Sequence, residues 1–149
     1  NLRFAGLLYL CDADAEQTCT MLKTDKKLRR YCKFILHALQ QPEIDSPYAL
    51  KKLLFQSDFP TVSDLLCLRA ICTGRSDTQW QQMLQQLQQT PIYLRDLKIN
   101  GTQLKALGIR NTAISQTLLY LIDCVHKDPS CNQTQQLLQL AQKYNESHD

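Results

Sequence analysis

The sequence predicts an all-α protein, and three observations support this. Glycine and proline interrupt helices and are scarce, at four and five in 149 residues, whereas leucine and glutamine are abundant. Apolar residues recur every three or four positions over several stretches, which is the period of an amphipathic helix. Few runs combine β-branched residues with alternation, as a half-buried strand would need. Hydrophobic residues make up 44% of the chain, which excludes the disordered class.

The first element expected is a helix over residues 2–10. It is apolar on almost all sides, so we expect it to be fully buried. A domain seldom starts inside its own core, and this predicts that the chain is the C-terminal piece of a longer protein. Asp12-Ala13-Asp14 follows the helix in a polar context and is expected to be a loop.

Residues 25–40 form the clearest amphipathic helix, which Gln41-Pro42 ends. Its apolar side holds Leu28, Tyr31, Cys32, Ile35, Leu36 and Leu39, and its other side holds Lys26, Lys27, Arg29, Arg30 and Lys33. Two interpretations of the basic side stay open, a solvated surface and a set of phosphate contacts. His37 lies near the helix end, where we expect it to meet the last carbonyls or solvent.

The sequence predicts three more helices in the middle of the chain. Ser46-Pro47, a cap followed by proline, opens a helix through Phe55. Residues 58–61 are expected to form a break before a buried helix that ends near Cys72. Thr73-Gly74-Arg75 is expected to close that helix.

The third of these helices is rich in glutamine. Ser76 or Asp77 is expected to cap it. Trp80, Met83, Leu84 and Leu87 form one face, and we expect a solvated helix that links two subdomains. Thr90-Pro91 ends it.

The stretch from Leu94 to Leu121 reads as a short helix, a tight turn and a longer helix. Asn100-Gly101 is a turn signal, Thr102 can cap the short helix, and Gly108 is expected to end it. Asn111 or Thr112 is then expected to cap the longer helix, with Arg110 in the turn before it. Because free N–H groups at a helix start attract anions, a phosphate is a candidate ligand here. The alternative is an ordinary helical hairpin with a surface arginine.

The longer helix is expected to bury one apolar face, made by Ile114, Leu118, Leu121, Ile122 and Val125. The last helix is expected over residues 134–144, with Leu137, Leu140, Ala141 and Tyr144 facing inward, and residues 146–149 should fray. The predicted organisation is a helical body domain over 1–75, a linking helix over 76–90 and a helical tail domain over 91–149.

The formal charge of +3 is too small to indicate a partner, but its distribution is uneven. Residues 22–52 hold eight lysines and arginines against three acids, whereas residues 121–149 hold two against four. This asymmetry predicts a one-sided anion-binding surface.

The seven cysteines are odd in number and include no Cys-x-x-Cys pair, so reduced thiols in the cytoplasm are the favoured interpretation. Three glycosylation sequons, at Asn100, Asn132 and Asn145, keep a secreted, disulfide-bonded helical bundle open as an alternative. No apolar run is long enough to cross a membrane, and no zinc-ligand spacing is present.

Two parts of the chain resemble bacterial tRNA nucleotidyltransferases, the CCA-adding enzymes related to bacterial poly(A) polymerase. Ile99-Asn100-Gly101, Leu104, Leu107-Gly108, Ile114 and Leu118 are similar to the start of their tail domain. Arg3-Phe4-Ala5, Leu7-Leu8-Tyr9, Leu22-Lys23 and residues 26–28 are similar to their helical body domain. This chain has Asn111 and Thr112 in place of the family's Gly or Pro, and Ser115 in place of a second Gly.

The resemblance implies that this region holds the elbow of tRNA by phosphate and shape contacts. A head outside the chain would add nucleotides with Mg²⁺, so we expect no cofactor, metal site or catalytic residue here; membrane partners are not expected. The expected partners are tRNA and the parent enzyme's own head and neck, in the cytoplasm. The candidate RNA-binding residues are Lys26, Arg29, Arg30, Lys33, Lys98, Lys105, Arg110, Asn111 and Thr112. The main alternative is a non-catalytic protein-interaction domain. The resemblance is shared by enzymes of CCA addition and of poly(A) synthesis, and both activities stay open for the parent enzyme.

Overall fold

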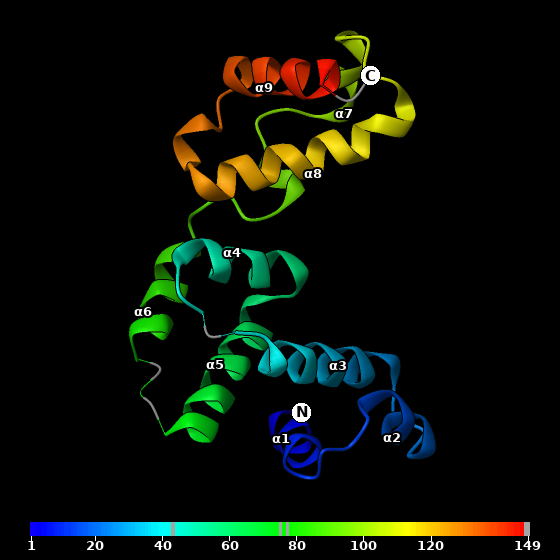
Figure 1. Ribbon diagram of the computed structural model, residues 1–149, viewed down its shortest axis with the longest axis vertical. Coiled ribbons are helices and arrows are strands. Elements are labelled where there is room, and N and C mark those ends of the chain that lie inside the picture. Colours follow the sequence, from blue (N-terminus) through cyan, green and yellow to red (C-terminus); the bar gives the residue numbers. More distant parts are fainter. Residues whose placement is uncertain (43, 75, 77, 148–149) are drawn as a thin grey trace. The chain divides into compact units, whose positions relative to one another are not determined.

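The computed structural model describes residues 1–42, 44–74, 76 and 78–147 (Figure 1). Every regular element in these ranges is helical, so the predicted all-α class is confirmed. The chain forms two compact units, Asn1–Gln88 and Gln89–Asp149, and each unit has its own buried side chains. The helices of the first unit are α1 (Leu2–Leu10), α2 (Ala15–Met21), α3 (Lys26–Gln40), α4 (Pro47–Gln56), α5 (Phe59–Thr73) and α6 (Thr78–Leu87). The second unit contains η1 (Leu94–Asp96), α7 (Gly101–Ala106), α8 (Asn111–Lys127), η2 (Pro129–Cys131) and α9 (Thr134–Glu146).

Helix α3 is central to the first unit, where it packs against α1, α2 and α5. The apolar side predicted from its sequence is the side that it buries. The core formed by these four helices contains Ala5, Leu8, Ala15, Cys19, Tyr31, Cys32, Ile35, Ala38, Leu65 and Leu68. Helices α4 and α6 pack against each other and against α5.

Short polar side chains start the helices of the first unit. Asp14, Asp25, Ser46 and Asp58 each accept a hydrogen bond from a backbone N–H in the first turn of α2, α3, α4 and α5. The polar loop at residues 12–14 and the cap at Ser46 are thus confirmed. The predicted break at residues 58–61 is too long. Asp58 caps α5, and Pro60 fits within its first turn because the N–H that proline lacks has no partner there.

The prediction that residues 2–10 form a fully buried helix is wrong in its burial. Helix α1 has the expected bounds, and Ala5 and Leu8 are buried, but Leu7 is 57% exposed and Leu10 is 80% exposed. Composition predicts how apolar a helix is on each side. It does not predict how many neighbours the fold supplies, and α1 packs against α3 and α5 only on one side.

The glutamine-rich helix α6 packs within the first unit. Its Leu84 and Leu87 are buried, and the side chain of Gln81 donates to the carbonyl oxygen of Ser63 in α5 over 3.3 Å. The segment expected to link two subdomains therefore includes a helix that is part of the first of them. Ser76 Oγ accepts from the N–H of Thr78, and Gly74 ends α5 with a φ of +65°. The expectations for Arg75 and Asp77 lie outside the described residues.

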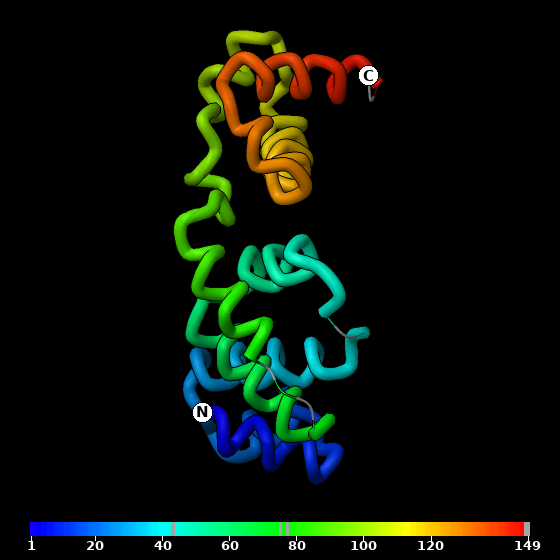
Figure 2. Tube along the Cα trace, turned by 90° about the vertical axis from the view of Figure 1, so that its left-hand side faces the viewer, coloured from blue at the N-terminus to red at the C-terminus, as the bar shows by residue number. Residues whose placement is uncertain are grey.

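The second unit is built around α8, which α9 crosses and α7 contacts (Figures 1 and 2). Its buried side chains are mostly aliphatic: Ile92, Leu97, Ile99, Leu104, Ile109, Thr117, Leu121, Ile122, Val125, Leu137 and Ala141. Helix α9 runs to Glu146, two residues beyond the predicted end, and the Glu146 carboxylate accepts from Gln142 over 3.1 Å. His148 and Asp149 lie outside the described residues.

Two capping predictions in this unit are wrong. Asn100, not Thr102, caps α7, because its side chain accepts from the N–H of Gln103 over 3.1 Å. Asn100-Gly101 therefore starts a helix where a turn was expected. Helix α8 begins at Asn111, so Asn111 and Thr112 are its first helical residues. The capping position belongs to Arg110, whose side chain makes no capping hydrogen bond. Gly108 ends α7 with a φ of +81°, as predicted.

All seven cysteines are free, and Cys19 and Cys32 lie in the core of the first unit. Among the described residues, the helices are too short or too polar for any of them to cross a bilayer.

Candidate nucleic-acid interface

Four cations lie along one face of α3, and we call Lys26, Arg29, Arg30 and Lys33 the basic face. They recur every three or four residues, so they project from the same side of the helix. Lys26, Arg30 and Lys33 are exposed, and Arg29 is half-buried. His37 continues the row one turn further and is also exposed. The structure therefore brings together the four candidate residues that the sequence placed on this helix.

Few acids neutralise the basic face. Lys33 forms an ion pair with Glu16 of α2 at 2.9 Å, and both side chains are more than half exposed. Such exposed pairs contribute little, so a phosphate can compete with Glu16 for Lys33. No carboxylate in the described ranges lies within ion-pair distance of Lys26, Arg29 or Arg30. The Nε atom of Arg29 is buried and, in the same part of the chain, has no hydrogen-bond partner.

One end of α3 borders a mixed-charge cavity of about 580 Å³. Lys27 and Arg30 line it, as do Tyr31, Asp58 and Asp64. Burial, and then the hydrogen bond of 2.7 Å that Tyr31 donates to Asp64, raise the pKa of the Tyr31 phenol. Hydrogen bonds from Thr61 lower the pKa of Asp58, and Lys27 and Arg30 lower it further. Asp58 therefore partly offsets the positive charge of Arg30 on the side that faces the cavity. It has no such effect on Lys26 or Arg29.

The position of the lysines along α3 is unfavourable for the helix itself. Lys26 and Lys27 are the first two residues of α3, and its first turn contains no acid. A helix carries partial positive charge at this end, where acids stabilise it and cations do not. Helix stability alone therefore does not explain the basic residues in this turn.

The second unit holds the other candidate residues. Lys105 is exposed in the last turn of α7, and Arg110, Asn111 and Thr112 are exposed at the start of α8. Lys98 is exposed, and its Nζ donates to Gln133 over 3.4 Å. Arg110 stands where the helix start was expected to attract an anion, next to backbone N–H groups that no side-chain cap covers. The basic face and this turn belong to different units, so each is a separate candidate.

Several residues that shape these surfaces gave no signal in the sequence. Arg69 of α5 donates to the carbonyl oxygens of Gln41 and Pro42 over 3.0 Å each, and also to that of Ala38. It therefore caps the C-terminal end of α3 from another helix. Asn132 likewise makes long-range hydrogen bonds to the backbone in the second unit. It accepts from the N–H of Lys98 and donates to the carbonyl oxygen of Asp96, each over 3.0 Å. These partners lie 27 to 36 residues away, beyond the reach of local patterns.

No group of three or more histidine, cysteine or acidic side chains that could hold a metal ion is found in the described part of the chain. Comparison with protein families, with curated proteins and with solved structures finds no match to this chain.

Proposed function

We propose that this chain is a non-catalytic helical module that binds the phosphate backbone of a folded RNA through the basic face of α3. The observation that carries the proposal is the row of Lys26, Arg29, Arg30 and Lys33 on one side of the helix, with Glu16 as its ion-pair partner. Phosphate contacts position an RNA without reading its sequence. tRNA is the target that the resemblance to CCA-adding enzymes names.

Two further features support phosphate as the ligand. The guanidinium of Arg29 has no ion-pair partner among the described residues, and its buried Nε has no hydrogen-bond partner there, so no protein acceptor competes for its charge. Lys26 and Lys27 stand at the helix end where cations are unfavourable, which is the arrangement expected when binding rather than stability sets the residue type.

The test is the salt dependence of RNA binding. A variant with Lys26→Gln, Arg29→Gln and Arg30→Gln is compared with the parent chain against labelled tRNA at several salt concentrations. If each cation meets one phosphate, the slope of log affinity against log salt shrinks by roughly 0.7–0.9 per contact. The matched control replaces Lys23, Lys52 and Lys143, which are exposed cations outside the basic face, by glutamine. An equal loss in both variants assigns the effect to net charge and contradicts the proposal.

Lys26→Gln by itself separates binding from stability. Removing a cation from the first turn of α3 should raise the free energy of unfolding by a few tenths of a kcal/mol. The same change should weaken tRNA binding. A solvated surface predicts the first effect without the second, so unchanged affinity in a more stable variant contradicts RNA binding at this residue.

The start of α8 is a second candidate surface for the same RNA. Arg110→Ala should weaken tRNA binding by about 1–3 kcal/mol, the range for a lost charge-assisted contact, and equally for different tRNA sequences. Lys105→Gln should have a smaller effect of the same sign. Thermal stability should not change, because Arg110 is exposed and its side chain makes no capping bond. Unchanged affinity would restrict RNA binding to the first unit.

The resemblance extends the proposal to a CCA-adding enzyme whose head, with Mg²⁺, would add the nucleotides in the cytoplasm. This chain alone should then incorporate no nucleotide when it is incubated with CTP, ATP, Mg²⁺ and tRNA lacking its 3′ end. Incorporation above a blank would contradict the non-catalytic assignment.

A protein-interaction domain is the second candidate. The observation in its favour is the exposure of large apolar side chains in the first unit, at 80% for Leu10, 75% for Met21 and 74% for Ile71. A module that binds a protein through these residues, and not RNA, would show no saturable tRNA binding, so the same tRNA titrations separate the two candidates.

A further inference from the structure

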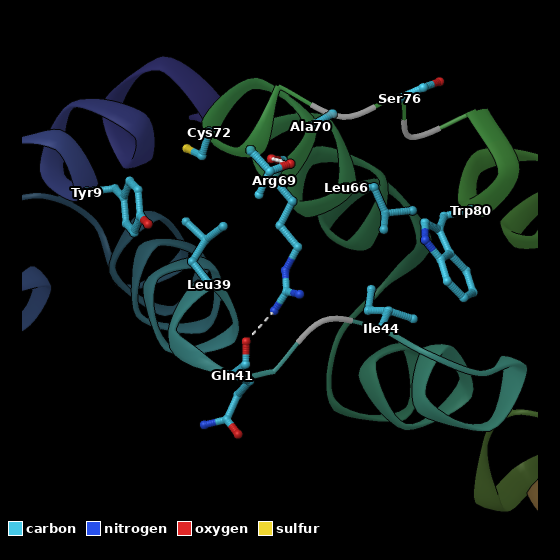
Figure 3. Close-up of a pocket in the computed structure, with 11 residues that line it drawn as sticks. Tyr9, Leu39, Gln41, Ile44, Leu66, Arg69, Ala70, Cys72, Ser76 and Trp80 are labelled. Atoms are coloured by element: carbon cyan, nitrogen blue, oxygen red, sulfur yellow. Dashed lines mark hydrogen bonds between the residues drawn. The ribbon is translucent and has the colours of Figure 1, made fainter.

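The first unit contains a cavity of about 210 Å³ beside the C-terminal end of α3 (Figure 3). Its lining combines aromatic side chains from α1 and α6 with aliphatic ones from α3, α5 and the loop before α4. The lining includes Tyr9, Leu39, Ile44, Leu66, Arg69 and Trp80. In Figure 3, Arg69 lies in the middle, with Tyr9 and Trp80 at opposite ends.

Arg69 makes the cavity a poor anion site. Its guanidinium donates to the carbonyl oxygens of Ala38, Gln41 and Pro42 (Figure 3 marks the bond to Gln41). These bonds lie near the guanidinium plane and place its charge against the negative end of α3. A flat ring can still stack on the face of a guanidinium held in this way. The cavity therefore favours an uncharged aromatic group over a phosphate.

The volume of the cavity and its aromatic lining both suit an uncharged aromatic ligand. An engineered protein cavity of about 150 Å³ with an apolar lining binds benzene, so 210 Å³ has room for one larger ring system. Trp80 is half-buried, which leaves part of its indole available for stacking. Unpaired RNA bases are commonly held by stacking on aromatic side chains or on arginine planes.

The cavity and the basic face share a helix. Leu39 lines the cavity, and Lys33 of the basic face precedes it by six residues, or about 9 Å along the axis of α3. We propose that the cavity holds one unpaired nucleobase of the RNA whose phosphates lie on the basic face, with the base stacked on Trp80 and Arg69. This inference rests on the proposed RNA-binding function and deepens it.

The first experiment uses an uncharged probe. Trp80 is the single tryptophan of the chain, so its fluorescence reports on the cavity without a label. Adenosine should change the Trp80 emission in a saturable way, whereas ribose 5-phosphate should not. Ala70→Phe adds a ring at the cavity wall and should weaken adenosine binding at least tenfold. Ala106→Phe, at an exposed position of α7, is the matched control and should bind adenosine as the parent does.

The second experiment uses RNA. Trp80→Leu should weaken binding to a labelled single-stranded oligoadenylate about tenfold, as expected for the loss of one stacked base, while the salt slope stays unchanged. The far-UV circular dichroism of each variant checks its fold, and Ala70→Phe repeats the test with Trp80 in place.

The two proposals can fail separately. If neutralising the basic face leaves the salt slope unchanged while adenosine still binds, the RNA-binding proposal fails and the cavity remains a nucleoside site. If the slope shrinks but adenosine leaves Trp80 emission unchanged, the nucleobase inference is overturned. Equal adenosine affinity in Ala70→Phe and the parent chain would also overturn it.

Discussion

Asn132 shows how one residue can have a role that its local sequence hides. The sequence marks it as the start of a glycosylation sequon, but the side chain is only 8% exposed. Its Oδ1 and its Nδ2 each form a hydrogen bond with the backbone. A glycan on Nδ2 would replace one of its two hydrogens and would need space that this buried position does not offer. Asn100, the first residue of another sequon, caps α7. In both cases the structure gives the asparagine a structural use.

Asn132→Ala should destabilise the second unit by at least about 2 kcal/mol, because it leaves the Lys98 N–H and the Asp96 carbonyl without their partner. Urea unfolding followed by circular dichroism measures this. The neighbouring variant Gln133→Ala, at an exposed position, should change stability by less than about 0.5 kcal/mol. Similar small effects in both variants would mean that water replaces the Asn132 amide.

The cysteines differ in reactivity because they differ in burial. Cys19 and Cys32 are inaccessible in the core, and burial, with a smaller effect of Cys19, raises the pKa of the Cys32 thiol to about 11. Since the thiolate is the reactive form, Cys32 should react with a thiol reagent at pH 8 only after unfolding. Exposed Cys11 and Cys72 should react at once, and all seven thiols should react in denaturant. A shortfall in the denatured count would indicate disulfides.

At the scale of elements, helix positions followed closely from sequence, whereas some helix starts did not. The sequence placed α3, α4 and α5 within a few residues, since period and capping residues are local signals. It misplaced the start of α8 because Asn111 and Thr112 are both good caps in isolation. Their conformation is helical in the fold, and Ile109, which is buried, fixes the chain just before them.

The cap of α5 makes part of the stability depend on pH. Hydrogen bonds from Thr61 hold the folded pKa of Asp58 below its usual range. The ionised cap therefore stabilises the fold fully above the unfolded pKa of about 3.9, and this contribution is lost as the pH falls through the folded pKa. Asp58→Ala should cost about 1 kcal/mol at pH 7, and its difference from the parent should shrink below about pH 4.

The control for the Asp58 prediction is Asp12→Asn, which removes an exposed carboxylate that lies outside the helix caps. Urea titrations at pH 7, 5, 4 and 3 give the free energy of unfolding for each variant. A destabilisation by Asp58→Ala that is the same at every pH would show that the cap works without its charge.

At the scale of the whole molecule, the chain has two cores in place of one. The first combines α1 to α6, and the second is formed by the elements after Gln88. Trp80 belongs to the first unit, so its emission follows the unfolding of that unit, whereas circular dichroism follows both. This gives separate probes within one chain.

Variants in one core should therefore move one transition. Leu65→Ala should lower the urea midpoint of Trp80 emission strongly, since truncating a fully buried leucine costs about 2–5 kcal/mol. Asn132→Ala should leave that midpoint unchanged and shift only a part of the circular dichroism signal. If both variants move both signals together, the two units unfold as one cooperative body.

The sequence by itself determined the all-α class, the amphipathic α3 with its basic face, and most helix bounds. Those depend on period, capping residues and turn glycines, which act over a few residues. Only the tertiary structure decided that α1 leaves Leu7 and Leu10 exposed and that Arg69 caps α3. It also decided that Asn132 is buried and donates to the backbone at Asp96. It also decided that Tyr9 and Trp80 line one cavity. These features join residues tens of positions apart, and their energies come from burial and hydrogen bonds that exist only after the helices pack.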